Sequence, residues 1–75
     1  MEDLRDRARL GVLKFVLDRG GSASLGEIHE FSGKKYLIMH QGFSRLMDSM
    51  VSEGLIDFDF TSNTATLTEA GQEKI

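Results

Sequence analysis

The chain has 75 residues, of which 40% are hydrophobic and 28% are charged, and it carries a formal net charge of -3. This length holds one domain, residues 1–75, and the balance of apolar and charged residues is typical of a globular chain. No apolar run approaches the ~18 residues of a membrane-spanning helix, and the charged N-terminus lacks the apolar segment of a secretory signal. The absence of cysteine excludes disulfides and thiolate chemistry and fits a reducing compartment, so we expect a cytoplasmic protein with no membrane contact.

Residues 2–18 are predicted to form the first helix, because Leu4, Ala8 and Val12 recur with a helical period. The helix is expected to end at Gly20–Gly21, since glycine readily adopts the left-handed conformation that closes a helix. A second apolar row beside the first indicates either burial on two sides or a contact between two copies of the chain. The row that forms this candidate dimer contact consists of Leu10, Leu13 and Leu17.

Two further helices are predicted in the middle of the chain. Ser24 and Glu27 have the spacing of a capping box, so the second helix is expected to begin here and to end at Ser32–Gly33. The third helix is predicted over about residues 36–53, and Gly54 is expected to close it. Its apolar stripe consists of Met39, Phe43, Leu46, Met47 and Met50.

A β-hairpin is predicted next, because the apolar period changes to that of a strand. Phe58 and Phe60 alternate with aspartates, as in a half-buried strand. A turn at Thr61–Thr64 would place Phe60 opposite Ala65 and Phe58 opposite Leu67, with every apolar side chain on one face. A slip of one residue would destroy this match.

Two flanking segments complete the predicted domain. Ser22–Ser24 is a candidate for a third short strand, and Thr68 is expected to cap a final helical turn, Glu69–Ile75. The elements together predict an α+β fold with three helices and a two- or three-stranded antiparallel sheet.

The order of these elements resembles that of the winged helix-turn-helix proteins of bacteria and archaea, in particular the small regulators of the MarR and PadR type. In those proteins the third helix runs into a Gly-Leu-Ile sequence, and the second wing strand runs into Leu-Thr and a glycine. The corresponding residues here are Met47, Met50, Gly54, Leu55 and Ile56, and then Leu67, Thr68, Glu69 and Gly71. The resemblance extends from about Leu10 to Ile75 and implies a winged-helix fold.

The resemblance also implies that the chain binds double-stranded DNA, as a transcriptional regulator and as a homodimer, with the third helix in the major groove. Arg45 has the donors to pair with guanine, and Gln41 has the groups to pair with adenine. Gly42 would allow a partner's backbone to approach closely. The candidate DNA-binding residues are Lys34, Lys35, Tyr36, His40, Gln41, Ser44 and Arg45, and Arg5, Arg7 and Arg9 are further phosphate candidates on the first helix.

Three features favour an alternative function, a winged-helix module that binds another protein, or serves as a phage or replication accessory protein, without touching DNA. The chain is acidic, whereas phosphate binding depends on Lys and Arg. The predicted wing follows Asp57 and Asp59, lacks Lys and Arg, and consists of Thr61, Ser62, Asn63 and Thr64. Leu37 and Ile38 do not fall on the apolar stripe of the third helix, and in this alternative they form, together with Tyr36, an apolar anchor for the partner. Clustered cations on one face would favour DNA, whereas an acidic face with an apolar patch would favour a protein partner.

No pattern in the sequence predicts catalysis or a cofactor. His29 and His40 are the only histidines, and no further ligands stand at the spacing of a zinc site. Asp57 and Asp59 alternate along a strand rather than in an oxygen-rich loop, so calcium binding is not expected. A glycine-rich phosphate loop and a serine nucleophile motif are also absent. We therefore expect no enzyme, no metal site and no cofactor.

Overall fold

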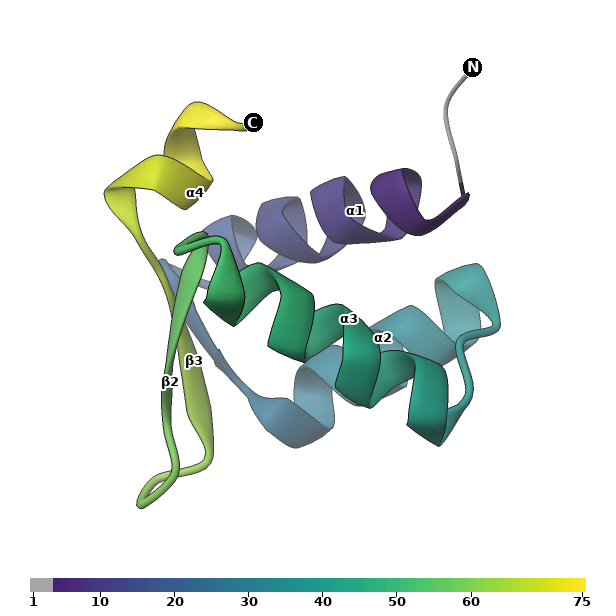
Figure 1. The fold of residues 1–75 in the computed structure, drawn as a ribbon. Coiled ribbons are helices and arrows are strands. Elements are labelled where there is room, and N and C mark those ends of the chain that lie inside the picture. Colours follow the sequence, from purple (N-terminus) through teal and green to yellow (C-terminus); the bar gives the residue numbers. More distant parts are fainter. Residues whose placement is uncertain (1–3) are drawn as a thin grey trace.

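The computed structural model describes residues 4–75, with side chains from residue 6 onward. In chain order its elements are α1 (Leu4–Asp18), β1 (Ser22–Ser24), α2 (Leu25–Tyr36), α3 (His40–Ser52), β2 (Ile56–Asp59), β3 (Thr64–Leu67) and α4 (Glu69–Glu73) (Figure 1). The strands form an antiparallel sheet in the order β1-β3-β2, which confirms the third strand. The fold is the predicted α+β arrangement of a winged helix, with the β2–β3 hairpin as the wing.

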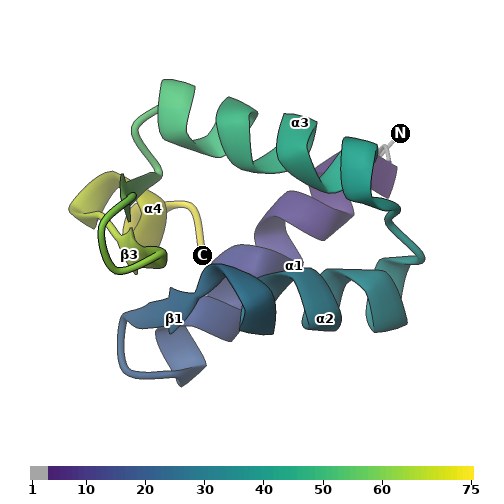
Figure 2. The same cartoon turned by 90° about the horizontal axis from the view of Figure 1, so that it is seen from below.

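The helix α1 packs against both α2 and α3: these two helices lie on opposite sides of it in the view of Figure 2, and both lie below it in Figure 1. Its residues Ala8, Val12 and Val16 are fully buried. The predicted end of the helix is confirmed, since Gly20 and Gly21 have φ angles of +88° and +98°. Residues 2 and 3 of the predicted helix lie outside the described residues. Within residues 4–75, no helix combines the length and the apolar character that crossing a bilayer requires.

The second apolar row of α1 does not form the continuous surface that a dimer contact would need. Leu13 is only 2% exposed, because it packs into the core of its own chain. Leu10 is half-buried, and Leu17 is exposed. The candidate contact is therefore wrong for Leu13, and the wide apolar arc of α1 mainly reflects burial on more than one side.

The boundary between α2 and α3 differs from the prediction. The helix α2 continues through Gly33 and ends at Tyr36, where Leu37 adopts a left-handed conformation and donates its N–H to the Ser32 carbonyl. A glycine inside a helix costs only about 1 kcal/mol, which the burial of α2 against α1 offsets. The helix α3 accordingly begins at His40 rather than near residue 36, and Met39 is its exposed N-cap instead of the first residue of the apolar stripe.

The wing has a different register from the one predicted. Phe58 lies opposite Ala65 rather than Leu67, a shift of two residues. The strand ends early because the Asp59 carboxylate accepts the Thr61 N–H at 2.9 Å and starts the turn there. Asn63 closes the turn with a φ of 58°, as its predicted place in the turn allows. A shift of two residues preserves which side chains face the core, but it removes Phe60 from the sheet.

The joint between α3 and the sheet agrees with the prediction. Gly54 has a φ of 75°, which lets α3 stop abruptly before β2. Thr68 caps α4 by accepting the Gly71 N–H at 3.0 Å, and its hydroxyl donates to the Leu55 carbonyl at 2.9 Å. Gly71 is required here, because a Cβ at this position would overlap the Leu55 carbonyl oxygen.

Candidate functional site

The helix α3 exposes a polar stripe on the side opposite to the core. It buries Phe43, Leu46, Met47 and Met50. The predicted contacts on its outer side are all exposed: His40, Gln41, Ser44 and Arg45. Arg45 forms no ion pair with another described residue. Gly42 is exposed, and a Cβ added there would touch the Ile38 Cγ2 at 3.4 Å.

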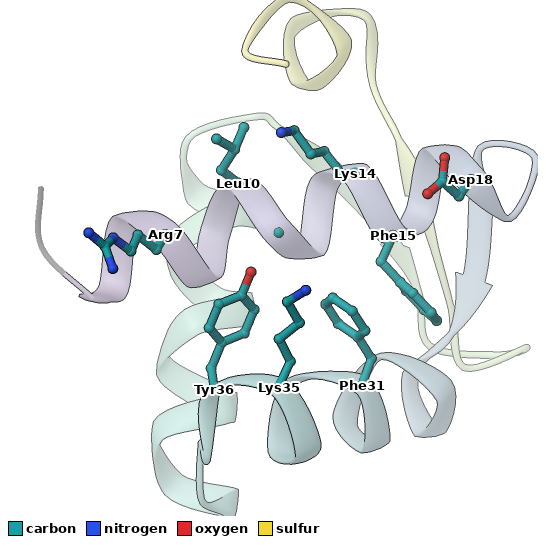
Figure 3. Close-up of a pocket in the computed structure, with 9 residues that line it drawn as sticks. Arg7, Leu10, Lys14, Phe15, Asp18, Phe31, Lys35 and Tyr36 are labelled. Carbon is teal, nitrogen blue, oxygen red and sulfur yellow. The ribbon is translucent and has the colours of Figure 1, made fainter.

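Lys34, Lys35 and Tyr36 belong to the last turn of α2 and not to the start of α3. The Lys34 Nζ lies 2.9 Å from a carboxylate oxygen of Glu30. The side chains of Lys35 and Tyr36 point toward α1 (Figure 3), and the Tyr36 ring packs edge-on against Phe31 with their centroids 6.0 Å apart. The predicted cations therefore do not gather on the exposed stripe of α3.

An open groove of about 490 Å³ lies between α1 and α2 (Figure 3). Phe15 and Phe31 stack in it with their ring centroids 4.5 Å apart. Gly11 makes room for Tyr36, because a Cβ at residue 11 would overlap the tyrosine hydroxyl. The cations that line this groove are Arg7, Lys14 and Lys35. The only signal in the sequence for this close approach of α1 and α2 is Gly11, a glycine within a predicted helix.

Arg9, another arginine of the first helix, already has a partner within the chain. Arg9 forms an ion pair with Glu53, at the far end of α3. The side chain of Arg5 lies outside the described residues. Among the described side chains of α1, Arg9 is therefore held by its own chain rather than free to meet a phosphate group.

A second groove, of about 450 Å³, runs between α3 and the wing, and we call it the wing groove. Phe60 is 86% exposed and Val51 is 42% exposed, so much of its wall faces solvent. The rings of Phe58 and Phe60 meet edge-to-face with their centroids 4.7 Å apart, which supports Phe60 beside the groove. The residues that line it are Leu25, Phe43, Ser44, Met47, Asp48, Val51, Ser52, Phe58 and Phe60. The sequence pattern does not reveal this groove, because the alternation of apolar residues predicts Phe60 on the buried face of the sheet.

The wing itself is polar and acidic. Thr61, Ser62 and Asn63 lie in its turn, whereas Thr64 belongs to β3. Asp59 accepts hydrogen bonds from the Thr61 backbone and from Ser62, and these bonds hold the pKa of its carboxyl below the usual value. This carboxylate stays charged near neutral pH, in a segment, residues 56–67, that contains no Lys or Arg. The wing is therefore a poor surface for phosphate groups.

The loop between α2 and α3 is apolar and prominent. Leu37 is 81% exposed and Met39 is 79% exposed. Ile38 and Tyr36 are instead partly buried and packed against the core. The predicted anchor of Tyr36, Leu37 and Ile38 is therefore wrong for Tyr36 and Ile38, and the exposed pair is Leu37 and Met39.

The two histidines lie near each other, with ring centroids 5.7 Å apart. His29 also packs edge-on against Phe43 at 4.7 Å, which explains its place at the margin of the core. Among residues 4–75, no group of three or more His, Cys, Asp or Glu side chains is arranged to hold a metal ion.

Comparison with known proteins adds no family to these observations. No protein-family model, no curated protein and no solved structure matches the chain. Two surfaces therefore bear on the function. The wing groove is apolar and carries one carboxylate, whereas the first turns of α3 are polar and carry a single arginine.

Proposed function

We propose that this winged helix is a protein-interaction module, and that its wing groove binds a segment in which apolar side chains lie next to Lys or Arg. The observation that carries the proposal is the chemistry of the groove. Its lining is apolar, and Asp48 is the only charged residue among the described residues that line it. Asp57 and Asp59 alternate with Phe58 along the neighbouring strand, so their side chains lie on the other face of the hairpin and add negative charge only from a greater distance. A surface of this kind repels phosphate groups and attracts cations.

Phe60 is the residue on which the binding energy is expected to depend most. An apolar side chain that covered Phe60 and Val51 would remove both from water. Burial of one side chain of the size of Leu or Phe stabilises a contact by about 1.5–3 kcal/mol. Aromatic residues beside a pocket often dominate the energy of protein interfaces. The carboxylates would add specificity and a faster encounter with a basic partner.

A library of random peptides tests the proposal, because it offers the groove many combinations of apolar and charged side chains. We expect selection on the intact chain to enrich peptides that combine apolar and basic residues. Phe60→Ser should weaken their binding by roughly tenfold or more. Ile75→Ser is the matched control, because Ile75 is also an exposed apolar residue but does not line the groove. Enrichment of acidic peptides, or equal binding by the two variants, would contradict the proposal.

DNA binding is a second candidate function, and a separate observation favours it. Along the first turns of α3, Gln41, Ser44 and Arg45 are exposed, and the exposed Gly42 would admit a phosphate or a base edge. The resemblance to winged-helix regulators supports the same surface. Because this stripe carries few cations, we expect weak binding with a shallow dependence on salt, since the slope grows with the number of phosphates neutralised.

Fluorescence anisotropy with a random-sequence duplex, over a range of salt concentrations, tests the DNA candidate. Arg45→Ala should weaken binding and change its salt dependence, whereas Lys35→Ala, which lies off the stripe, should have a smaller effect and Phe60→Ser should have none. Arg45→Lys is a useful comparison, because it keeps the charge but loses the paired donors that recognise guanine. A duplex that fails to bind even at low salt would exclude this candidate and leave the peptide-binding proposal standing.

A further inference from the structure

We propose that the segment that occupies the wing groove is the α2–α3 loop, Leu37–Met39, of a second copy of this chain. This inference rests on the proposed function, because it names the partner of the same groove. The copies would associate head to tail, with the loop of one in the groove of the next.

Leu37 stands at a position where the fold itself gives no reason for a leucine. Its φ of 56° and ψ of 35° lie in the left-handed region, which is strained for leucine but readily adopted by glycine. The side chain is 81% exposed, so burial within the chain does not offset this strain. The N–H of Leu37 is held by the Ser32 carbonyl, and this geometry presents the side chain to solvent. A contact with another molecule would account for the leucine.

The loop has the chemistry that the wing groove requires. Leu37 and Met39 supply exposed apolar side chains. Lys34 and Lys35 precede them on the last turn of α2 and are exposed. Lys34 pairs with Glu30, and the side chain of Lys35 points toward α1, so the segment carries positive charge beside its apolar pair rather than on it. The groove is apolar and acidic, and Asp48 lies on its wall. Methionine also suits such a site, because its flexible, unbranched side chain fills irregular spaces.

The placement of the two surfaces determines the symmetry of the contact. The α2–α3 loop lies at the start of α3, whereas the wing extends from the other end of this helix (Figure 1). One chain therefore cannot place its own loop against its own wing. Each contact joins two different surfaces and leaves a free loop at one end and a free groove at the other. Such contacts produce growing chains or closed rings.

Sedimentation velocity over a series of protein concentrations tests this inference with paired variants. The unmodified chain should increase in mass as concentration rises. Leu37→Ser and Phe60→Ser should each remain monomeric, because each removes one of the two surfaces. An equal mixture of these two variants should form a complex of one copy of each and grow no further, since only one intact loop–groove pair remains. Ile75→Ser is the control and should associate like the unmodified chain.

Met39→Ser gives a second way to disable the loop, and it leaves the left-handed residue unchanged. A mixture of the single variants that stays monomeric would overturn the inference, as would single variants that associate like the unmodified chain. The outcome is separable from the proposed function. If the intact chain is monomeric at every concentration but still selects basic, apolar peptides through Phe60, the inference fails and the proposed function stands.

Discussion

At the scale of single residues, Gly11 sets how closely α1 and α2 approach. A Cβ at this position would overlap the Tyr36 hydroxyl and ring. We expect Gly11→Ala to destabilise the fold by about 1 kcal/mol, because overpacking of 1–3 kcal/mol exceeds the gain of up to about 1 kcal/mol in helix propensity. Thermal or urea unfolding measures this change.

Two further variants check the cause of that effect. In a Tyr36→Ala background the overlap is absent, so Gly11→Ala should stabilise the helix instead. Gly26→Ala is the matched control in α2, because no described heavy atom lies within 4 Å of a Cβ added there. It should be neutral or stabilising. The explanation fails if Gly11→Ala has the same effect with and without Tyr36.

Leu37 provides a prediction in which stability and association change in opposite directions. Leu37→Gly should relieve the left-handed strain and raise the stability by about 1 kcal/mol, which corresponds to about 4–8 °C in Tm for a domain of this size. The same change should abolish self-association. Asn63→Gly is the control, because Asn63 has a similar φ of 58° but asparagine tolerates it, so its gain should be smaller. Loss of stability in Leu37→Gly would contradict the argument from strain.

At the scale of elements, the start of α2 depends on the capping box between Ser24 and Glu27. Glu27 donates its N–H to Ser24 Oγ at 3.2 Å, and a Glu27 carboxylate oxygen accepts the Ser24 N–H at 3.3 Å. The hydrogen bonds from Ser24 hold the pKa of Glu27 below its usual value, with a smaller contribution from Arg19. Ser24→Ala should cost about 1 kcal/mol, the typical effect of losing an N-cap.

The lowered pKa of Glu27 also predicts how the stability of α2 depends on pH. A carboxyl whose pKa falls on folding stabilises the fold above its unfolded-state pKa, and this contribution is lost as pH falls through the lower, folded-state pKa. Glu27→Gln should therefore be less stable than the unmodified chain near neutral pH, and the difference should shrink in acid. Glu73→Gln, on α4, controls for the loss of one negative charge. A difference in Tm that stays constant from neutral to acid pH would argue against this role.

The elements also show what the sequence was able to predict. The capping box at Ser24, the glycine stop at Gly54 and the cap at Thr68 were all correct, because each depends on neighbouring residues. The wing register was wrong because alternation identifies the buried face but not the opposite residue. That choice depended on a single turn contact, from Asp59 to the Thr61 backbone.

The candidate site was predicted less completely than the fold, for a related reason. The exposed stripe of α3 follows from helical periodicity, and His40, Gln41, Ser44 and Arg45 lie on it as expected. The wing groove depends on tertiary geometry, since it needs Phe60 to leave the sheet and lie beside α3. The end of α2 was misplaced because Leu37 carries no local signal for a left-handed residue. Lys34, Lys35 and Tyr36 were consequently assigned to the wrong helix.

At the scale of the whole molecule, the contacts that the surface favours depend more on where the charges lie than on the net charge of -3. Lys34 and Lys35 lie at the end of α2, whereas Asp48 lies at the wing groove, and Asp57 and Asp59 lie on the wing. This polarity favours a contact between unlike surfaces of two copies over a contact between like surfaces. It also opposes contact between the wing and a phosphate backbone. Composition alone did not reveal it, because it depends on where the fold places α2 and the wing.

The response of self-association to salt follows from this polarity and from the apolar contact at its centre. Salt screens the attraction between the lysines that precede the loop and the Asp48 carboxylate of the groove, but it leaves the apolar burial in place. Raising salt from ~50 to ~200 mM should therefore weaken association by less than about tenfold, whereas proteins with many phosphate contacts lose about 10³-fold or more in DNA affinity over the same range.

Asp48→Lys should weaken association at low salt and reverse the trend, because added salt would then screen a repulsion. Sedimentation velocity at matched concentrations measures both effects, and Asp18→Lys, on α1 away from the wing groove, is the control for a change in net charge. An unchanged salt trend in Asp48→Lys would mean that the lysines that precede the loop do not meet this wall of the groove.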